Sequence, residues 1–276
     1  HTMQVGTVTL SGGTSYDIFV AAFTSTGKAK WARGFGGTSS DYGWAIAADA
    51  SGNSYVTGYF YNSMTVGTTT LTSKGSYDIP LICLDASGKV KWAKSFGSSS
   101  SDYGYGIAVD AGANVYLTGY FYNSVNFGGT TLSSNGYGDM YLASFTSAGA
   151  HRWSKGGFGG SSSDYGYGVA ADAAGNAYVT GYFYKNATFG SLTLTAGTYG
   201  DMYVAGFNAS GALVWVRNHG GPGNYTYGRA IASGGGGLYV TGYFYPPSVD
   251  LGGGLIKAAA GSSTYSYDAY VVKYAP

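Results

Sequence analysis

The sequence predicts an all-β fold built from tandem repeats, and three observations lead to it. All 13 acidic residues are aspartate and glutamine occurs only at Gln4, so residues that favour surface helices are scarce. Runs of β-branched and aromatic residues alternate with Gly, Asn, Asp and Ser clusters, a pattern typical of short strands and tight turns. A Tyr-Val-Thr-Gly-Tyr-Phe-Tyr segment recurs about every 61 residues, with Leu117 replacing Val once, beginning at Tyr55, Tyr116, Tyr178 and Tyr239.

A repeat of this length indicates one unit that buries its apolar faces against copies of itself. We expect residues 1–276 to form a single domain. The net charge of +1 removes the electrostatic case for nucleic acid or an anionic membrane as the main partner. No apolar run reaches the roughly 18 residues needed to span a bilayer, so membrane insertion is not expected. No signal peptide is visible at the start of the chain, and Cys83, in an apolar run, is expected to be buried.

The second repeat illustrates the expected elements in order. Strands are predicted at Tyr103–Asp110 and Val115–Tyr122, joined by a tight turn into a hairpin. A connector containing Val125–Leu132 follows. Strands at Asp139–Phe145 and Ala150–Ser154 form a second hairpin. Four successive strands therefore predict one antiparallel sheet per repeat.

Four-stranded sheets repeated at this spacing predict a β-propeller, in which the faces of neighbouring blades pack together. Both faces of each blade should then be apolar. The fourth strand combines a tryptophan with Lys or Arg, and we expect these charges to protect an outer edge, with a basic binding stripe as the alternative. The four copies of this strand are centred on Trp31, Trp92, Trp153 and Trp215.

The number of blades follows less directly, because the third strand occurs five times and the other marked strands four times. Complete repeats are predicted at about 37–97, 98–159 and 160–221, with partial repeats at 4–36 and 222–276. Five blades are favoured, with four as the alternative. An open array completed by a second subunit is a further alternative. The third strands begin at Asp17, Asp78, Asp139, Asp201 and Asp268.

The repeat resembles the bacterial β-propeller repeat called SBBP and, more distantly, the NHL repeat. The resemblance rests on Gly-Ile-Ala-Val-Asp-x-x-x-Asn-Val-Tyr-Leu-Thr-Gly, then Phe-Gly-Gly-Thr-Thr-Leu, then Gly-Asp-Met-Tyr-Leu-Ala-Ser-Phe. It covers nearly the whole chain and implies a secreted or cell-surface protein of bacteria, with no catalytic residues to carry over. The last repeat departs from it, with Thr226 in place of an aspartate and an insertion around 246–264.

Catalytic and metal sites are not expected. Almost every aspartate is a repeat element, whereas catalysis needs a unique constellation of groups. A hydrolase with paired carboxylates stays a minor alternative. The three histidines show no zinc spacing, and the Asp-x-x-Gly-Asn turns at Asp49, Asp110 and Asp172 each offer calcium a single carboxylate. We therefore expect no metal and no cofactor, and plain turns at these positions.

The best candidate for binding is the loop that joins one repeat to the next, with the sequence Ser-Ser-Asp-Tyr-Gly followed by Trp or Tyr. In a propeller this loop shares one face with the connector after the second strand. Aromatic rings that stack on sugars, beside short polar groups that bond hydroxyls, suit a multivalent glycan site. The alternative is that the tyrosines pack between blades and the aspartates cap the turn. The predicted site residues are Asp41, Tyr42, Trp44, Asn62, Asp102, Tyr103, Tyr105, Asn123, Asp164, Tyr165, Tyr167, Tyr227 and Arg229.

The sequence thus predicts an extracellular or cell-surface propeller without catalytic activity. Its partner is expected to be a glycan or a cell-surface polymer, bound through the loop-rich face. The alternative is a structural surface or self-assembly module whose partner is another protein, including a second copy of this chain.

Overall fold

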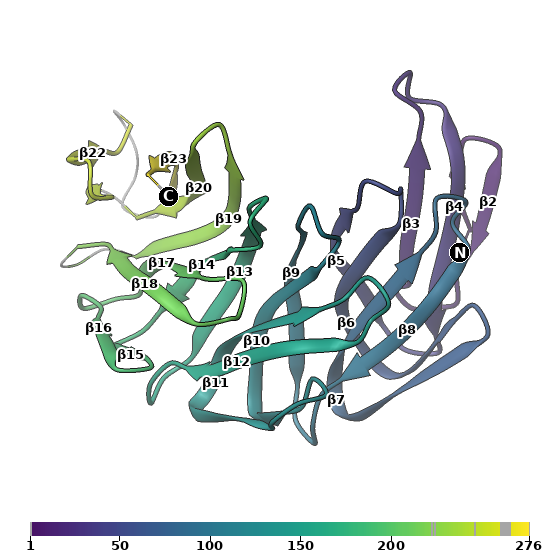
Figure 1. Cartoon of the computed structure of the whole chain (residues 1–276), viewed down its shortest axis with the longest axis horizontal. Coiled ribbons are helices and arrows are strands. Elements are labelled where there is room, and N and C mark those ends of the chain that lie inside the picture. Colours follow the sequence, from purple (N-terminus) through teal and green to yellow (C-terminus); the bar gives the residue numbers. More distant parts are fainter. Residues whose placement is uncertain (1, 222, 224, 246, 260–265, 276) are drawn as a thin grey trace.

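The computed structural model describes residues 2–221, 223, 225–245, 247–259 and 266–275. These residues contain strands β1 to β23 and no α-helix. The sheets follow one another in chain order along an arc, with the two chain ends at its opposite ends (Figure 1). The all-β prediction is confirmed. Within the described residues, no helix is long and apolar enough to cross a membrane.

Three repeats each form an antiparallel four-stranded unit, as the sequence predicts. Every unit places its strands in chain order from the inner to the outer side of the arc, so the first strand is innermost and the tryptophan-bearing strand outermost. The three units are β5 (Asp41–Ala48), β6 (Ser54–Val66), β7 (Thr69–Leu84) and β8 (Val90–Phe96); β9 (Asp102–Val109), β10 (Val115–Val125), β11 (Leu132–Phe145) and β12 (His151–Phe158); and β13 (Asp164–Ala171), β14 (Ala177–Phe183), β17 (Asp201–Phe207) and β18 (Leu213–His219).

The two ends of the chain form partial units. At one end, β3 (Ile18–Phe23) pairs with β4 (Ala29–Gly37), which also touches β6. At the other end, β19 (Thr226–Gly234), β20 (Gly237–Phe244) and β23 (Asp268–Tyr274) form a three-stranded sheet. No hydrogen-bonded pairing among the described strands joins the first unit to the last. The blade number of five, or alternatively four, therefore stays a prediction.

The segments expected to be simple connectors are hairpins, which is a difference from the sequence interpretation. In the first two complete units the second and third strands run on past the sheet, as in the pairs Ser124–Ser133 and Val125–Leu132. Elsewhere the same hairpin stands apart as β1 (Thr2–Val5) with β2 (Val8–Ser11), β15 (Asn186–Phe189) with β16 (Leu192–Thr195), and β21 (Ser248–Asp250) with β22 (Leu255–Lys257). The predicted insertion contains this last hairpin, and its residues 246 and 260–264 lie outside the described residues.

The core lies between successive units, because both faces of each unit are apolar. One cluster joins Tyr55 and Leu81 of the first complete unit to Leu117 and Phe121 of the second, and all four side chains are fully buried. Cys83 belongs to the same cluster and is buried with a free thiol. Burial of such large apolar side chains contributes about 1.5–3 kcal/mol each. The packing between blades that the sequence predicts is therefore present.

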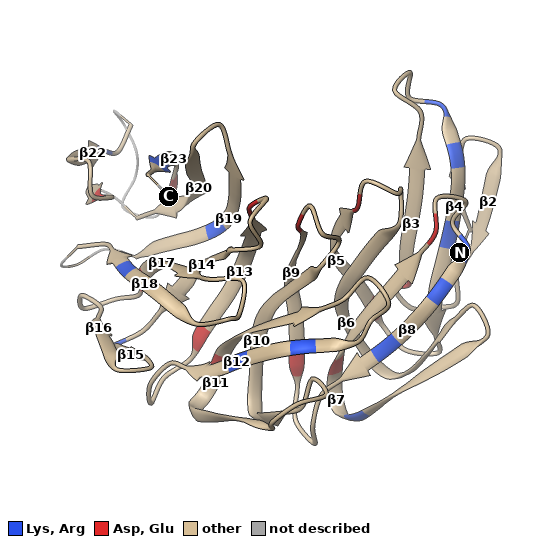
Figure 2. Cartoon of the chain, viewed as in Figure 1, with Lys and Arg blue, Asp and Glu red and all other residues tan. Residues whose placement is uncertain are grey.

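The basic side chains gather on the fourth strands. Figure 2 shows blue bands along β4, β8, β12 and β18, on the outer side of the arc. Lys and Arg at an outer edge discourage pairing with a foreign strand. A further band lies on β19, the innermost strand of the last unit, and it corresponds to Arg229.

Candidate functional site

The three loop aspartates open the innermost strands and are buried. Asp41, Asp102 and Asp164 are each at most 1% exposed. Their Oδ2 atoms accept backbone hydrogen bonds from the residues four positions earlier, namely Gly37 at 2.9 Å, Ser98 at 2.7 Å and Gly160 at 2.8 Å. This geometry caps the loop, as the packing alternative expects, and presents no carboxylate to solvent. A ligand-binding role for the three aspartates stays a prediction without geometric support.

Burial also changes the acidity of these groups. Loss of hydration raises the pKa of Asp102 to about 7, against the opposing hydrogen bond from the Ser98 amide. Burial raises the pKa of Asp41 and of Asp164 to about 7 as well. The aspartates are therefore largely protonated at slightly acidic pH, which is uncommon for this residue type.

Each loop aspartate lies beside the aspartate that opens a third strand. A methyl group added to Gly159 would lie 2.6 Å from Asp164 Oδ2 and 2.7 Å from Asp139 Oδ1, so the two carboxylates converge on this glycine. Asp78 and Asp102 form the equivalent pair, and their Oδ1 atoms are buried without a hydrogen-bond partner. Both members are buried in the pairs of Asp78 with Asp102 and of Asp139 with Asp164, whereas Asp17, beside Asp41, is only partly buried.

The loop tyrosines form a continuous ladder of rings along the inner strands. Within a unit, each pairs across the sheet with a tyrosine of the second strand, as in Tyr103–Tyr120 at 4.8 Å between ring centroids. Between units, the second-strand ring contacts the next loop tyrosine, as in Tyr120–Tyr165 at 4.6 Å and Tyr182–Tyr227 at 4.4 Å. Edge-to-face and tilted contacts of this kind add about 0.5–1.5 kcal/mol each. Tyr42, Tyr103, Tyr165 and Tyr227 therefore pack between units and bring the predicted residues into one surface.

A second row lies two residues further along the inner strands. Trp44 contacts Tyr105 at 4.9 Å between ring centroids, and Tyr105 contacts Tyr167 at 5.0 Å. The guanidinium carbon of Arg229 lies 4.3 Å from the centre of the Tyr167 ring. Trp44 is 52% exposed, whereas the other three are half-buried. The structure thus unites all four predicted residues in one row that crosses four units.

The two predicted asparagines reach the loops as expected. Asn62 Nδ2 donates to Ser39 Oγ at 3.0 Å, and Asn123 Nδ2 donates to Ser100 Oγ at 2.6 Å. Both asparagines have a positive φ, near 60°, a conformation that Asn tolerates better than most residues. In the third complete unit Lys185 occupies the same position with a φ of 58°. Its long side chain replaces the short amide that fastens the loop in the other two units.

A pocket of about 350 Å³ lies beside Lys185, on the face where the third loop meets the end of β14. It contains one predicted site residue, Tyr165, and two serines of the predicted loop. Sequence reasoning missed the remaining lining residues, although the change from Asn to Lys at position 185 is a signal that could have found them. The lining residues are Tyr137, Ser162, Ser163, Tyr165, Tyr184, Lys185, Thr198 and Tyr199.

Comparison with known proteins agrees with this architecture. Residues 153–182, which run from β12 into β14, match the family model described as a β-propeller repeat, SBBP. Over this segment the chain is similar to β-propeller repeat proteins. It is also 25% identical over 232 residues to an uncharacterized WD repeat-containing protein of Acanthamoeba polyphaga mimivirus. The matched segment covers 70% of this chain and 17% of that relative, so the chain spans about a sixth of the relative's length.

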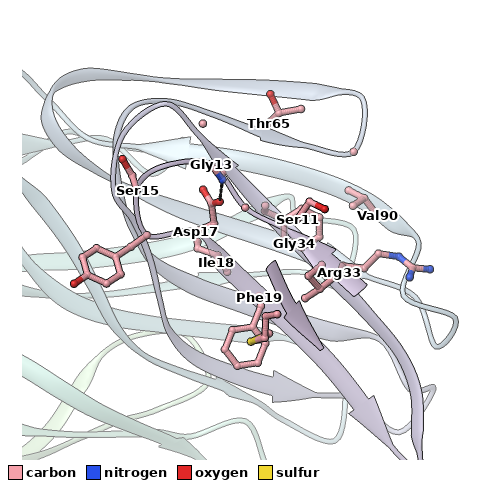
Figure 3. A pocket seen from close by; sticks show the side chains of 18 of the residues that line it. Ser11, Gly13, Ser15, Asp17, Ile18, Phe19, Arg33, Gly34, Thr65 and Val90 are labelled. Carbon is pink, nitrogen blue, oxygen red and sulfur yellow. Dashed lines mark hydrogen bonds between the residues drawn. The ribbon is translucent and has the colours of Figure 1, made fainter. Parts of the chain in front are cut away.

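A larger pocket, of about 1310 Å³, lies at the first unit of the chain. It is bounded by the β1–β2 hairpin, by β3 and β4, and by the start of β8. Figure 3 shows Asp17 there, with its Oδ2 atom accepting a hydrogen bond of 2.9 Å from the Gly13 amide, and Arg33 further along the pocket. No residue of this pocket belongs to the predicted site.

The turn aspartates of the propeller repeats bond to the protein's own groups. Asp49 Oδ1 accepts from the Ser51 and Asn53 amides, and Oδ2 accepts from the Asn53 side chain and the Tyr55 hydroxyl. Although partial burial opposes it, this set of hydrogen bonds holds the pKa of Asp49 below its ordinary value. The prediction of plain turns is confirmed. No group of three or more His, Cys, Asp or Glu side chains in the described residues could hold a metal ion.

Proposed function

We propose that this β-propeller repeat protein is a non-catalytic binding module that recognises glycans through the pocket beside Lys185. The single observation that carries the proposal is the lining of that pocket, which combines four tyrosines with three hydroxyl side chains and one ammonium group. Repeated propeller sheets support a binding or scaffolding role in general. The glycan as ligand, the absence of catalysis and an extracellular or cell-surface location are parts of the proposal.

The chemistry of the pocket suits a saccharide. A sugar ring offers C–H faces that stack on aromatic rings, and the tyrosines at 137 and 199 are 71% and 40% exposed, so their faces are accessible. Hydroxyl groups on the sugar need short donors and acceptors, which Ser162, Ser163 and Thr198 supply. Tyrosine loses little conformational entropy on binding, since only two torsions are fixed.

The pocket also indicates why one repeat is favoured over the others. In the first two units an asparagine-to-serine hydrogen bond fastens the loop over the corresponding place. The lysine in the third unit carries no such short amide, and the pocket lies there. The proposal therefore assigns the main saccharide contact to the third unit and not to several equal sites.

A structural, self-assembling module is the second candidate, and a specific observation favours it. The first and last units each leave a strand edge unpaired among the described residues, on β3 and on β23. Large apolar side chains are exposed on these strands, with Phe19 at 57%, Phe23 at 56% and Val271 at 72%. Free edges with apolar side chains are templates for pairing with another chain. Under this candidate the partner is a second copy.

A glycan array with three proteins tests the first candidate. The natural chain is compared with a Tyr137→Ala/Tyr199→Ala double variant and with Tyr239→Ala, a control whose ring is 39% exposed on β20 and lies outside the pocket. We expect binding to a related group of saccharides by the natural chain and the control, and loss in the double variant. A blank array from folded, monodisperse protein contradicts the proposal. Concentration-dependent association in sedimentation velocity, without a response to saccharide, favours the structural candidate.

A further inference from the structure

Among the departures from the repeat at the joint between the third complete unit and the last unit, three concern charged residues. Lys185 stands where the earlier repeats have Asn62 and Asn123. Arg229 stands where they have tryptophan or tyrosine, and Thr226 stands where they have a loop aspartate. Two neutral residues have become cations and one buried aspartate has been lost, so this joint carries two more cationic side chains than the repeat pattern prescribes.

Arg229 lies in a cage of aromatic rings. Its guanidinium carbon is 4.3 Å from the ring centre of Tyr167, 5.0 Å from that of Tyr243 and 5.8 Å from that of Tyr227. It also donates a short hydrogen bond to the Tyr243 hydroxyl. Among the described residues every contact recorded for this guanidinium is with a tyrosine, so no carboxylate neutralises it. On the inner strands β5, β9, β13 and β19 it is the only Lys or Arg.

The cage and the pocket share one cluster of tyrosines. Tyr165 lines the pocket, and its ring stacks on that of Tyr167 with 6.0 Å between the ring centroids. The guanidinium of Arg229 lies over the Tyr167 ring. Tyr184 also lines the pocket, and its ring lies 5.5 Å from that of Tyr182, which in turn lies 4.4 Å from that of Tyr227, the third ring of the cage. Lys185 and Arg229 therefore flank the same aromatic surface, one from the pocket and one from the inner strand.

We propose that this joint binds an acidic saccharide, of which one carboxylate pairs with Arg229 while the C–H faces of its sugar rings lie on the tyrosines of the pocket. The inference rests on the proposed glycan-binding function and names the class of saccharide. A planar guanidinium offers a carboxylate two parallel N–H donors, and rings around it reduce the competition from water. Lys185 adds a second positive charge at the pocket. Uronic acid residues carry one carboxylate on each sugar ring. This matches a surface on which tyrosine rings lie between two cationic side chains, Lys185 and Arg229.

The test uses two probes with the same sugar backbone, trigalacturonic acid and its fully methyl-esterified form, which carries methyl esters in place of the charged carboxylates. Binding is measured by the change in tryptophan fluorescence and by isothermal titration calorimetry at low and high salt. We expect the acid to bind about tenfold tighter than the ester at low salt, as one charge-assisted hydrogen-bonded pair provides. The preference should shrink as salt is added, since exposed charges are screened.

Three variants return the joint to the repeat pattern or serve as control. Arg229→Tyr installs the residue that the second and third repeats carry at this position, so the variant is expected to fold, which circular dichroism checks. It should lower the affinity for the acid about tenfold and leave that for the ester unchanged. Lys185→Asn should lower the affinity for the acid further. Arg217→Gln on the outer strand β18, where the guanidinium lies over Trp215, should change neither.

The outcomes separate the inference from the function on which it rests. If the natural chain binds acid and ester equally, or if folded Arg229→Tyr keeps the preference for the acid, the inference is wrong while the glycan-binding function stands. If neither probe binds and a glycan array is blank, the function itself fails. Loss of the acid preference in Arg229→Tyr, with binding of the ester intact, supports both.

Discussion

Trp92 Nε1 donates a hydrogen bond of 3.1 Å to the carbonyl oxygen of Ser147, which lies 55 residues later in the chain. The same link joins Trp31 to Ala86 at 2.9 Å and Trp153 to Ala209 at 3.0 Å. In each case the outermost strand of one unit is tied to the turn between the third and fourth strands of the next. This repeated hydrogen bond explains why a tryptophan recurs on the fourth strand, since the indole supplies both an apolar ring for the core and a hydrogen-bond donor.

Replacing Trp92 by phenylalanine should lower the free energy of unfolding by about 1–2 kcal/mol. The change removes the hydrogen bond to Ser147 and part of an indole that packs against the core cluster. Urea unfolding followed by circular dichroism measures the loss. Trp44→Phe is the matched control, because that ring is 52% exposed and should cost no more than about 0.5 kcal/mol. Equal losses of unfolding free energy in the two variants would contradict a stabilising role for the hydrogen bond between Trp92 and Ser147.

Glycine at the turn between the third and fourth strands should be required to different degrees in different units. Gly27 and Gly88 occupy the same repeat position with φ of 80° and 77°. A methyl group on Gly88 would lie 2.5 Å from Trp31 Cδ2, whereas one on Gly27 meets nothing within 4 Å. Gly27→Ala should therefore cost only the strain of a positive φ, about 1 kcal/mol. Gly88→Ala should cost clearly more, and a thermal melt of both variants distinguishes the two contributions.

Stability should fall as pH rises from about 4 to about 7. In the folded chain burial raises the pKa of Asp41, Asp102 and Asp164 to about 7, whereas their ordinary value is 3.8. Below pH 4 both states hold the protons. Between the two pKa values the unfolded state has lost protons that the folded state keeps, and each group then costs up to about 1.4 kcal/mol per pH unit.

Two asparagine variants test this sign. Asp102→Asn keeps an acceptor for the Ser98 amide and cannot ionise, so it should be more stable than the natural chain at pH 8 and equal to it near pH 3.5. Asp49→Asn should be less stable than the natural chain at pH 8, and the difference should shrink as the pH falls. The reason is that hydrogen bonds lower the pKa of Asp49, so that its contribution to stability exists only above the unfolded pKa. A flat profile of unfolding free energy against pH, measured by urea titration, would show that the loop carboxyls are ionised when folded.

The hydrogen bond from Asn123 to Ser100 should hold the loop of residues 98–101 closed. Asn123→Gly removes this bond of 2.6 Å and leaves the positive φ of 59° unstrained, because glycine adopts it freely. Amide hydrogen exchange in the loop should quicken about fivefold, as loss of roughly 1 kcal/mol predicts. Lys185→Gly is the control, since lysine makes no such bond, and exchange at 160–163 should not change.

The order of the strands, the apolar faces of the sheets and the basic fourth strand could be predicted from the sequence, because they depend on local patterns that recur in every repeat. The turn at Asp49 was predictable for the same reason. The different burial of neighbouring loop residues was not predictable, since both Asp102 and Tyr103 are polar in sequence but only the tertiary packing buries the carboxyl and leaves the ring partly exposed. Tyr137, within β11, and Tyr199, shortly before β17, were missed because they lie far from the loop in sequence and reach the pocket only when the sheets fold.

The acceptor of each tryptophan link is a main-chain carbonyl, which every residue type possesses. Apart from the turn glycine that each indole approaches, the hydrogen bond itself therefore asks for no particular side chain in the following unit. A whole repeat can be copied or deleted by recombination within its gene, and the new neighbours still meet a suitable joint. Compatibility between adjacent units then places little constraint on the lengthening and shortening of such an array.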